Sequence, residues 1–287
     1  METLQNLIDK YFKVDENTSA TIIITISIFL IGISIQFISN QIKKYFIKKV
    51  RRKTFIEIVR NLSKTTKKQS DKFVKTSESL SIESLGKFYL TRNVLGHIDS
   101  FREFNFVQVY ESFLYRINFK FINRRKLISK IYEHVKLTTV IDAKCNRDIE
   151  KLFDKLNHLE RGYLDSVDSL RKKFIELSDN IRYNGIKGLK KDYVEYIIAM
   201  DRVFANWSVL EDRGNIYISY NNLTSPLLKV NSDFVDCNRE LLDFLFAADN
   251  YYKRIIRLLD TYSKLFMDYA SCYKCSTKVL TLCINKI

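Results

Sequence analysis

The chain has 287 residues, 46% of them hydrophobic, and a formal net charge of +15. Its seven glycines and single proline compare with roughly twenty and fourteen at average usage, which argues against a turn-rich fold. The five cysteines are odd in number, and in a reducing cytoplasm we expect free thiols rather than disulfides. The composition therefore predicts an all-α protein of long helices joined by short polar loops.

Residues 1–19 are expected to form a short extracytoplasmic segment. The apolar residues Leu4, Leu7, Ile8 and Phe12 have the spacing of a small amphipathic helix at a membrane interface, and a frayed tail explains them equally well.

Residues 20–39 are predicted to be a transmembrane helix. The stretch Ala20 to Ile38 is nineteen uncharged residues with nine isoleucines, and as a helix it would span roughly 28 Å, close to the bilayer core. A buried core helix or strand would be shorter or show a polar face. A signal peptide would have a basic start and a cleavage site, and neither is present.

A basic collar follows the apolar run and sets its predicted orientation. Residues 39–75 carry thirteen basic and two acidic side chains, whereas residues 1–20 carry two and four. Because cytoplasmic flanks collect Lys and Arg, we expect the N-terminus outside an inner (cytoplasmic) membrane and the rest of the chain in the cytoplasm. The predicted contacts to anionic lipids are Lys43, Lys44, Lys48, Lys49, Arg51, Arg52 and Lys53.

Residues 40–85 are expected to form a basic juxtamembrane stalk. Apolar residues keep helical spacing only to about Leu62, so we expect the helix to extend that far and the Ser, Thr and Lys-rich stretch beyond it to be mobile.

The region from 87 to 141 is rich in aromatic and basic residues. Helical spacing of Phe106, Val109, Tyr110 and Phe113 favours a core-facing stripe. The alternative is a stacking surface for nucleic acid or a nucleotide base. The candidate anion or nucleic-acid contacts are Arg116, Lys120, Arg124, Arg125 and Lys126.

Two heptad patterns dominate the predicted cytoplasmic α-helical domain, residues 86–287. One runs from Ile149 to Ile181 with a stutter beside Gly162, and the other runs from Leu241 to Tyr273 after a predicted N-cap at Asp233. We expect these two helices to pack along each other with coiled-coil-like geometry, either as an antiparallel hairpin in one chain or between subunits of a homo-oligomer.

The segment between the heptads is predicted to hold one amphipathic helix, from Leu189 to Leu210. Ile216 to Tyr220 alternates like a strand but has no partner run, so we expect an extended loop there, near Pro226.

Catalytic and metal-binding motifs are absent from the sequence. The three histidines share no metal-ligand spacing, and Cys272 and Cys275 are most simply a pair of reduced thiols on one helix face. We therefore expect no catalytic residue, no metal and no cofactor.

These features predict a non-enzymatic, membrane-anchored helical protein that binds a cytoplasmic partner or signal and couples it to the membrane through self-assembly. Ser27, Gly32 and Ser34 are small residues that would let spans approach one another. The architecture is typical of a bacterial membrane effector or receptor, an analogy at the level of fold. The alternative function is a membrane-tethered nucleic-acid- or nucleotide-binding protein that uses residues 116–130.

Overall fold

The computed structural model describes residues 16–85, 97–113, 121–184, 190–234 and 239–287, and every regular element in these ranges is helical. The all-α prediction is confirmed for this part of the chain. In chain order the elements are α2 (Glu16–Ser79), α3 (His97–Arg102), α4 (Phe106–Phe113), α5 (Phe121–Asn184), α6 (Lys191–Ser208), α7 (Ile216–Ser219), the π-helix η1 (Tyr220–Thr224), α8 (Ser225–Asp233) and α9 (Arg239–Lys286). Of the predicted extracytoplasmic segment, residues 1–19, the first fifteen lie outside the described residues, and α2 begins at Glu16.

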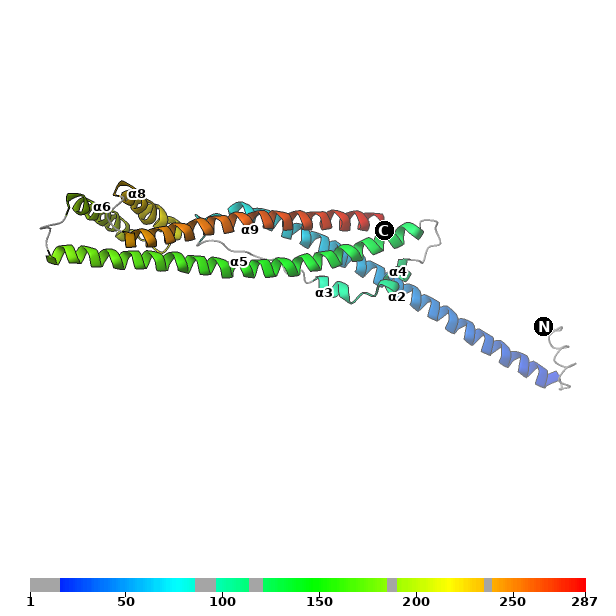
Figure 1. The fold of residues 1–287 in the computed structure, drawn as a ribbon. Helices are drawn as coiled ribbons and strands as arrows, with labels where there is room; N and C mark the ends of the chain where they lie inside the picture. The colour runs from blue at the N-terminus through cyan, green and yellow to red at the C-terminus, as the bar shows by residue number, and fades with distance from the viewer. Residues whose placement is uncertain (1–15, 86–96, 114–120, 185–189, 235–238) are drawn as a thin grey trace.

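Helix α9 is the central element of the body. It lies beside α5 and, in its second half, beside α2 (Figure 1). Hydrogen bonds from Tyr273 to Asp142 and from Tyr269 to Asp148 show that α9 is antiparallel to α5. Ser63 contacts Thr281 and Ser77 contacts Ser263, so α9 is antiparallel to α2 as well. Three long helices therefore form the body, with α9 running against the other two.

The α5 and α9 faces that meet are the two predicted heptad stripes. All ten α9 positions from Leu241 to Tyr273 are buried, and on α5 only the positions at Ile149, Leu177 and Ile181 remain half-buried. Helix α5 is much longer than its stripe, 64 residues in all. The two stripes therefore pair within one chain.

Gly162 lies where the α5 stripe changes its spacing. A Cβ atom at this position would lie 2.5 Å from the Cε1 and Cζ atoms of Tyr251, so the tyrosine ring of α9 occupies the space that a side chain would need. The stutter of the heptad pattern thus coincides with a close approach of the two helices.

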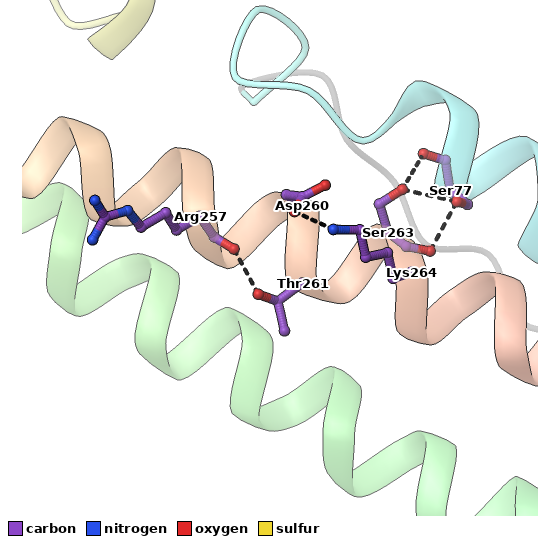
Figure 2. A network of polar contacts seen from close by, with 6 residues as sticks. All are labelled: Ser77, Arg257, Asp260, Thr261, Ser263 and Lys264. Atoms are coloured by element: carbon purple, nitrogen blue, oxygen red, sulfur yellow. Dashed lines mark hydrogen bonds and ion pairs between the residues drawn. The ribbon is translucent and has the colours of Figure 1, made fainter.

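Helices α2 and α9 meet through hydroxyl groups. The Ser77 hydroxyl donates to the Ser263 carbonyl at 2.8 Å, and the Ser263 hydroxyl donates back to the Ser77 carbonyl at 3.1 Å (Figure 2). Two helical turns away along α2, the Ser70 hydroxyl donates to the Ala270 carbonyl at 2.8 Å. Side chains that reach the partner's backbone in this way require the two helices to approach closely.

The prediction that the helix ends near Leu62 is therefore wrong. The helix continues to Ser79, and one of its faces is buried. The pattern was missed because this face consists mainly of small polar side chains, with Phe73 as its aromatic member packed on Phe266 and Tyr273. The buried polar residues of this face are Ser63, Thr66, Gln69, Ser70 and Ser77.

The end of the body far from α2's N-terminus carries α6, α7, η1 and α8 (Figure 1). Helix α6 agrees with its predicted bounds within two residues. The prediction of an extended loop at 216–220 is wrong, because these residues are helical. The Asn215 side chain caps the helix by accepting a hydrogen bond from the Ile218 amide. The π turn just before Pro226 has a physical cause, since proline cannot donate the next α-helical hydrogen bond.

Asp233 does not cap the last helix as expected. It ends α8, and α9 begins at Arg239. Tyr220 of η1 stacks on Tyr252 of α9 with ring centroids 3.5 Å apart and donates its hydroxyl to Asp249. This contact fixes the small helices against the body.

The opposite end is an aromatic cluster around Phe55 of α2. The Phe55 ring contacts three aromatic rings from other helices, with centroids 5.6 to 6.1 Å away: Phe101 of α3, Phe113 of α4 and Tyr132 of α5. The predicted aromatic stripe therefore faces the core, with Val109 and Phe113 buried and Phe106 and Tyr110 half-buried against them.

We expect Ser70→Leu to destabilise the body by about 2 kcal/mol, or roughly 4 to 8 °C in the midpoint of thermal unfolding. A leucine at this buried position separates α2 from α9, whereas the same change at the exposed Ser79 is a matched control with little effect. Circular dichroism of the full chain in detergent measures both. Equal midpoints for the two variants would contradict the close approach.

Gly162→Ala should cost about 1 kcal/mol, because the new methyl group displaces the Tyr251 ring. In a Tyr251→Ala background the same change should instead stabilise the protein by about 1 kcal/mol, the helix preference of alanine over glycine. A double-mutant cycle of unfolding midpoints checks the reversal of sign. Additive effects would show that Tyr251 does not occupy this space.

Candidate anion-binding site

A pocket lies where α2 meets the base of the helical body. Its volume is about 320 Å³, and α2, α4, the start of α5 and Ile287, which follows α9, form its walls. The lining residues are Tyr45, Lys48, Lys49, Arg52, Ser112, Phe113, Arg124 and Ile287. Four of the eight are cations, which sets this pocket apart chemically from the apolar hollow beside Phe101 and Tyr132.

One face of α2 supplies three of the cations. Tyr45, Lys48, Lys49 and Arg52 are spaced i, i+3, i+4 and i+7, the spacing of neighbours on one side of an α-helix. Phe55 lies on the same side one turn later and is buried in the aromatic cluster. The packing of Phe55 therefore fixes the direction in which this cationic face points.

Arg124 of α5 supplies the fourth cation. Its Nη1 donates to the carbonyl oxygen of Phe113 at the end of α4, at 3.4 Å. Phe113 and Ser112 are themselves buried, and the Ser112 hydroxyl donates to Val109 within α4. The half-buried Arg124 side chain is thus held at the pocket wall by α4.

The four cations have no acidic partner in the part of the chain that the structure describes. None of Lys48, Lys49, Arg52 and Arg124 has a carboxylate oxygen within 4.0 Å there. Like charges that line one concave surface focus a positive potential in it. The pocket is therefore suited to bind an anion.

The structure brings together parts of two predicted sets of site residues. Lys48, Lys49 and Arg52 come from the basic collar, and Arg124 comes from the candidate anion contacts. The other collar residues do not line the pocket, and Arg51 is half-buried while Lys43, Lys44 and Lys53 are exposed.

Of the remaining candidate anion contacts, the two that the structure describes, Arg125 and Lys126, do not line the pocket. Arg125 lies over the Tyr110 ring, 5.9 Å from its centroid, and Lys126 is exposed. Arg116 and Lys120 lie outside the described residues. Sequence reasoning missed Tyr45 as a site residue, although its spacing with Lys48 and Lys49 was a usable signal.

Tyr132 closes the aromatic cluster next to the pocket. Its hydroxyl donates to the Phe104 carbonyl at 3.0 Å, and its ring lies 4.7 Å from that of Phe101. Burial raises the pKa of Tyr132 to about 12, because the cluster disfavours the phenolate.

Metal-ligating residues do not gather in the described part of the chain, where no group of three or more His, Cys, Asp or Glu side chains could hold an ion. Cys272 and Cys275 are exposed, and Cys145 and Cys283 are buried. Burial raises the pKa of the Cys283 thiol. No protein-family model, curated protein or solved structure matches the chain.

Tyr132→Phe should reduce the loss of stability at high pH. Because the folded pKa is about 12 and the ordinary value is 10.0, the contribution of the neutral phenol is complete below pH 10 and is lost as the pH rises through about 12. Thermal midpoints measured from pH 9 to 12, with the phenolate absorbance, test this. The exposed Tyr183→Phe serves as the control. A Tyr132 phenolate that forms near pH 10 would contradict the buried environment.

Proposed function

We propose that the chain is a single-pass, N-out membrane protein that binds a cytoplasmic partner or signal and couples it to its membrane anchor without catalysis of its own. One observation carries the proposal. Helix α2 is uninterrupted from Glu16 to Ser79, so a single rigid element contains both the apolar run and a packed face of the body.

The first half of α2 has the properties of a span. Its most apolar stretch has a mean hydropathy of 2.4 and is not buried, and the helix is long and apolar enough to cross a bilayer. The hydroxyls of Thr25, Ser27 and Ser34 each donate to the carbonyl four residues earlier. These side chains therefore carry no unsatisfied donor that would oppose contact with lipid.

The collar supports the orientation, since its lysines and arginines follow the apolar run directly. A cytoplasmic body would then include the second half of α2 along with α5 and α9. Nothing covers Gly32 within 4 Å, so a second span has room to approach there. Self-assembly through the spans is the proposed route by which a partner bound to the body acts at the membrane.

Coupling follows from the packing of α2 on α9. The hydroxyl contacts from Ser63 to Ser77 bind α2 to α9 over four turns, and no loop separates this segment from the apolar run. A partner that displaces α9 would therefore tilt or rotate the whole of α2. A body joined to its anchor by a flexible linker would lose this link.

Replacing Ile28 and Ile31 by lysine should abolish membrane integration, because each charge near the centre of a span costs about 3 kcal/mol. The matched control replaces Ile198 and Ile256, exposed isoleucines of the body, by lysine. Alkaline extraction and a C-terminal reporter, read with protease added from outside, measure integration and orientation. Wild-type protein in the alkaline supernatant, or a C-terminus cut from outside, would overturn the proposal.

A further inference from the structure

We propose that the pocket lined by Lys48, Lys49, Arg52 and Arg124 binds the phosphate group of an anionic membrane lipid. The inference rests on the proposed membrane anchoring of α2, and it adds a ligand class that the anchoring by itself does not require.

The chemistry of the pocket selects a compact anion with several oxygens. Two guanidinium groups and two ammonium groups face it, from two different helices, and none is neutralised by a carboxylate within 4.0 Å in the described ranges. Guanidinium groups bind phosphate with two parallel hydrogen bonds, and lysines add charge at close range. A volume of about 320 Å³ has room for a phosphate and the adjoining glycerol.

The adjoining face of α2 indicates that this phosphate belongs to a lipid. Ile42, Phe46 and Val50 are spaced i, i+4 and i+8, and 51%, 56% and 63% of their surfaces are exposed. This apolar stripe points roughly a third of a turn away from the cationic face at the same level of the helix. A helix segment with apolar and cationic faces side by side lies at the boundary between acyl chains and headgroups.

Helix tilt and long side chains bridge the distance from the apolar run. Lys48 follows Ile38 by ten residues, or roughly 15 Å along the helix axis, and a tilt of about 40° reduces its height above the end of the apolar run to roughly 11 Å. The long lysine and arginine side chains reach back from there toward the headgroups. Tyr45 lines the pocket on the membrane side, a position where tyrosine side chains are enriched. The cations of the pocket are therefore within reach of the lipid headgroups.

A bound phosphate would connect α2 to α5. Lys48, Lys49 and Arg52 belong to α2 and Arg124 belongs to α5, while α4 contacts both helices and holds Arg124 through Phe113. Lipid occupancy would thus fix the angle at which α2 leaves the body (Figure 1). The lipid would act as a structural ligand at the base of the helical body rather than as a general counter-ion.

The test uses full-length protein in vesicles of phosphatidylcholine, with and without phosphatidic acid, followed by native mass spectrometry of retained lipid. The pocket variant is Lys48→Gln, Lys49→Gln and Arg52→Gln combined. The matched control is Lys43→Gln, Lys44→Gln and Lys53→Gln, which removes the same charge from the same segment outside the pocket. Arg124→Gln is paired with Lys126→Gln in the same way.

We expect wild-type protein to retain phosphatidic acid in preference to phosphatidylcholine. The pocket variant and Arg124→Gln should each lower the affinity about tenfold or more, while the matched controls keep it within about threefold. Equal losses in the pocket and control variants would overturn the inference, because they indicate only general attraction of the collar. Displacement of the lipid by millimolar inorganic phosphate or glycerol 3-phosphate would overturn the lipid source in favour of a free anion.

The two proposals fail in different ways. Protein that resists alkaline extraction but retains no phosphatidic acid refutes the lipid site and leaves the anchoring intact. Protein that alkali extracts refutes the anchoring, and the lipid site with it.

Discussion

Helix α9 packs on its two long neighbours by two different physical means, and the body depends on this difference. Toward α5 it presents leucine, isoleucine and tyrosine, whose burial removes apolar area from water. Toward α2 its contacts include small side chains such as Ser263, Ala270 and Thr277, so the backbones approach until hydroxyls reach the opposite carbonyls. The first contact provides stability, and the second fixes the register of α2.

That register determines the direction in which the side chains in the first half of α2 point. Because α2 does not break between Gly32 and Phe55, the side of the helix that packs in the aromatic cluster determines where every earlier side chain points. The cations of the collar are consequently sorted into a set that lines the pocket with Arg124 and a set that does not. A basic juxtamembrane segment in a flexible linker would have no such distinction.

The sequence predicted those parts of the fold in which large apolar side chains recur with helical spacing. The stripes through Leu152 and Leu245 fall in this class. It did not predict the packed segment from Ser63 to Ser77, since small hydroxyl side chains look alike whether they face water or a closely packed helix. The site was half predicted for a related reason: cation types and spacing are visible in the chain, but the meeting of Arg52 with Arg124 depends on tertiary packing between segments some seventy residues apart.

Because α2 is continuous, inserting or deleting residues in it would rotate its apolar run relative to the body. Each residue added between Ile38 and Lys43 would rotate the apolar run relative to the body by about 100°, whereas seven added residues would return it almost to its starting direction. Insertions and deletions in this short interval would therefore act as changes of angle rather than of length. A chain of this design would tolerate length variation there only in whole pairs of helical turns.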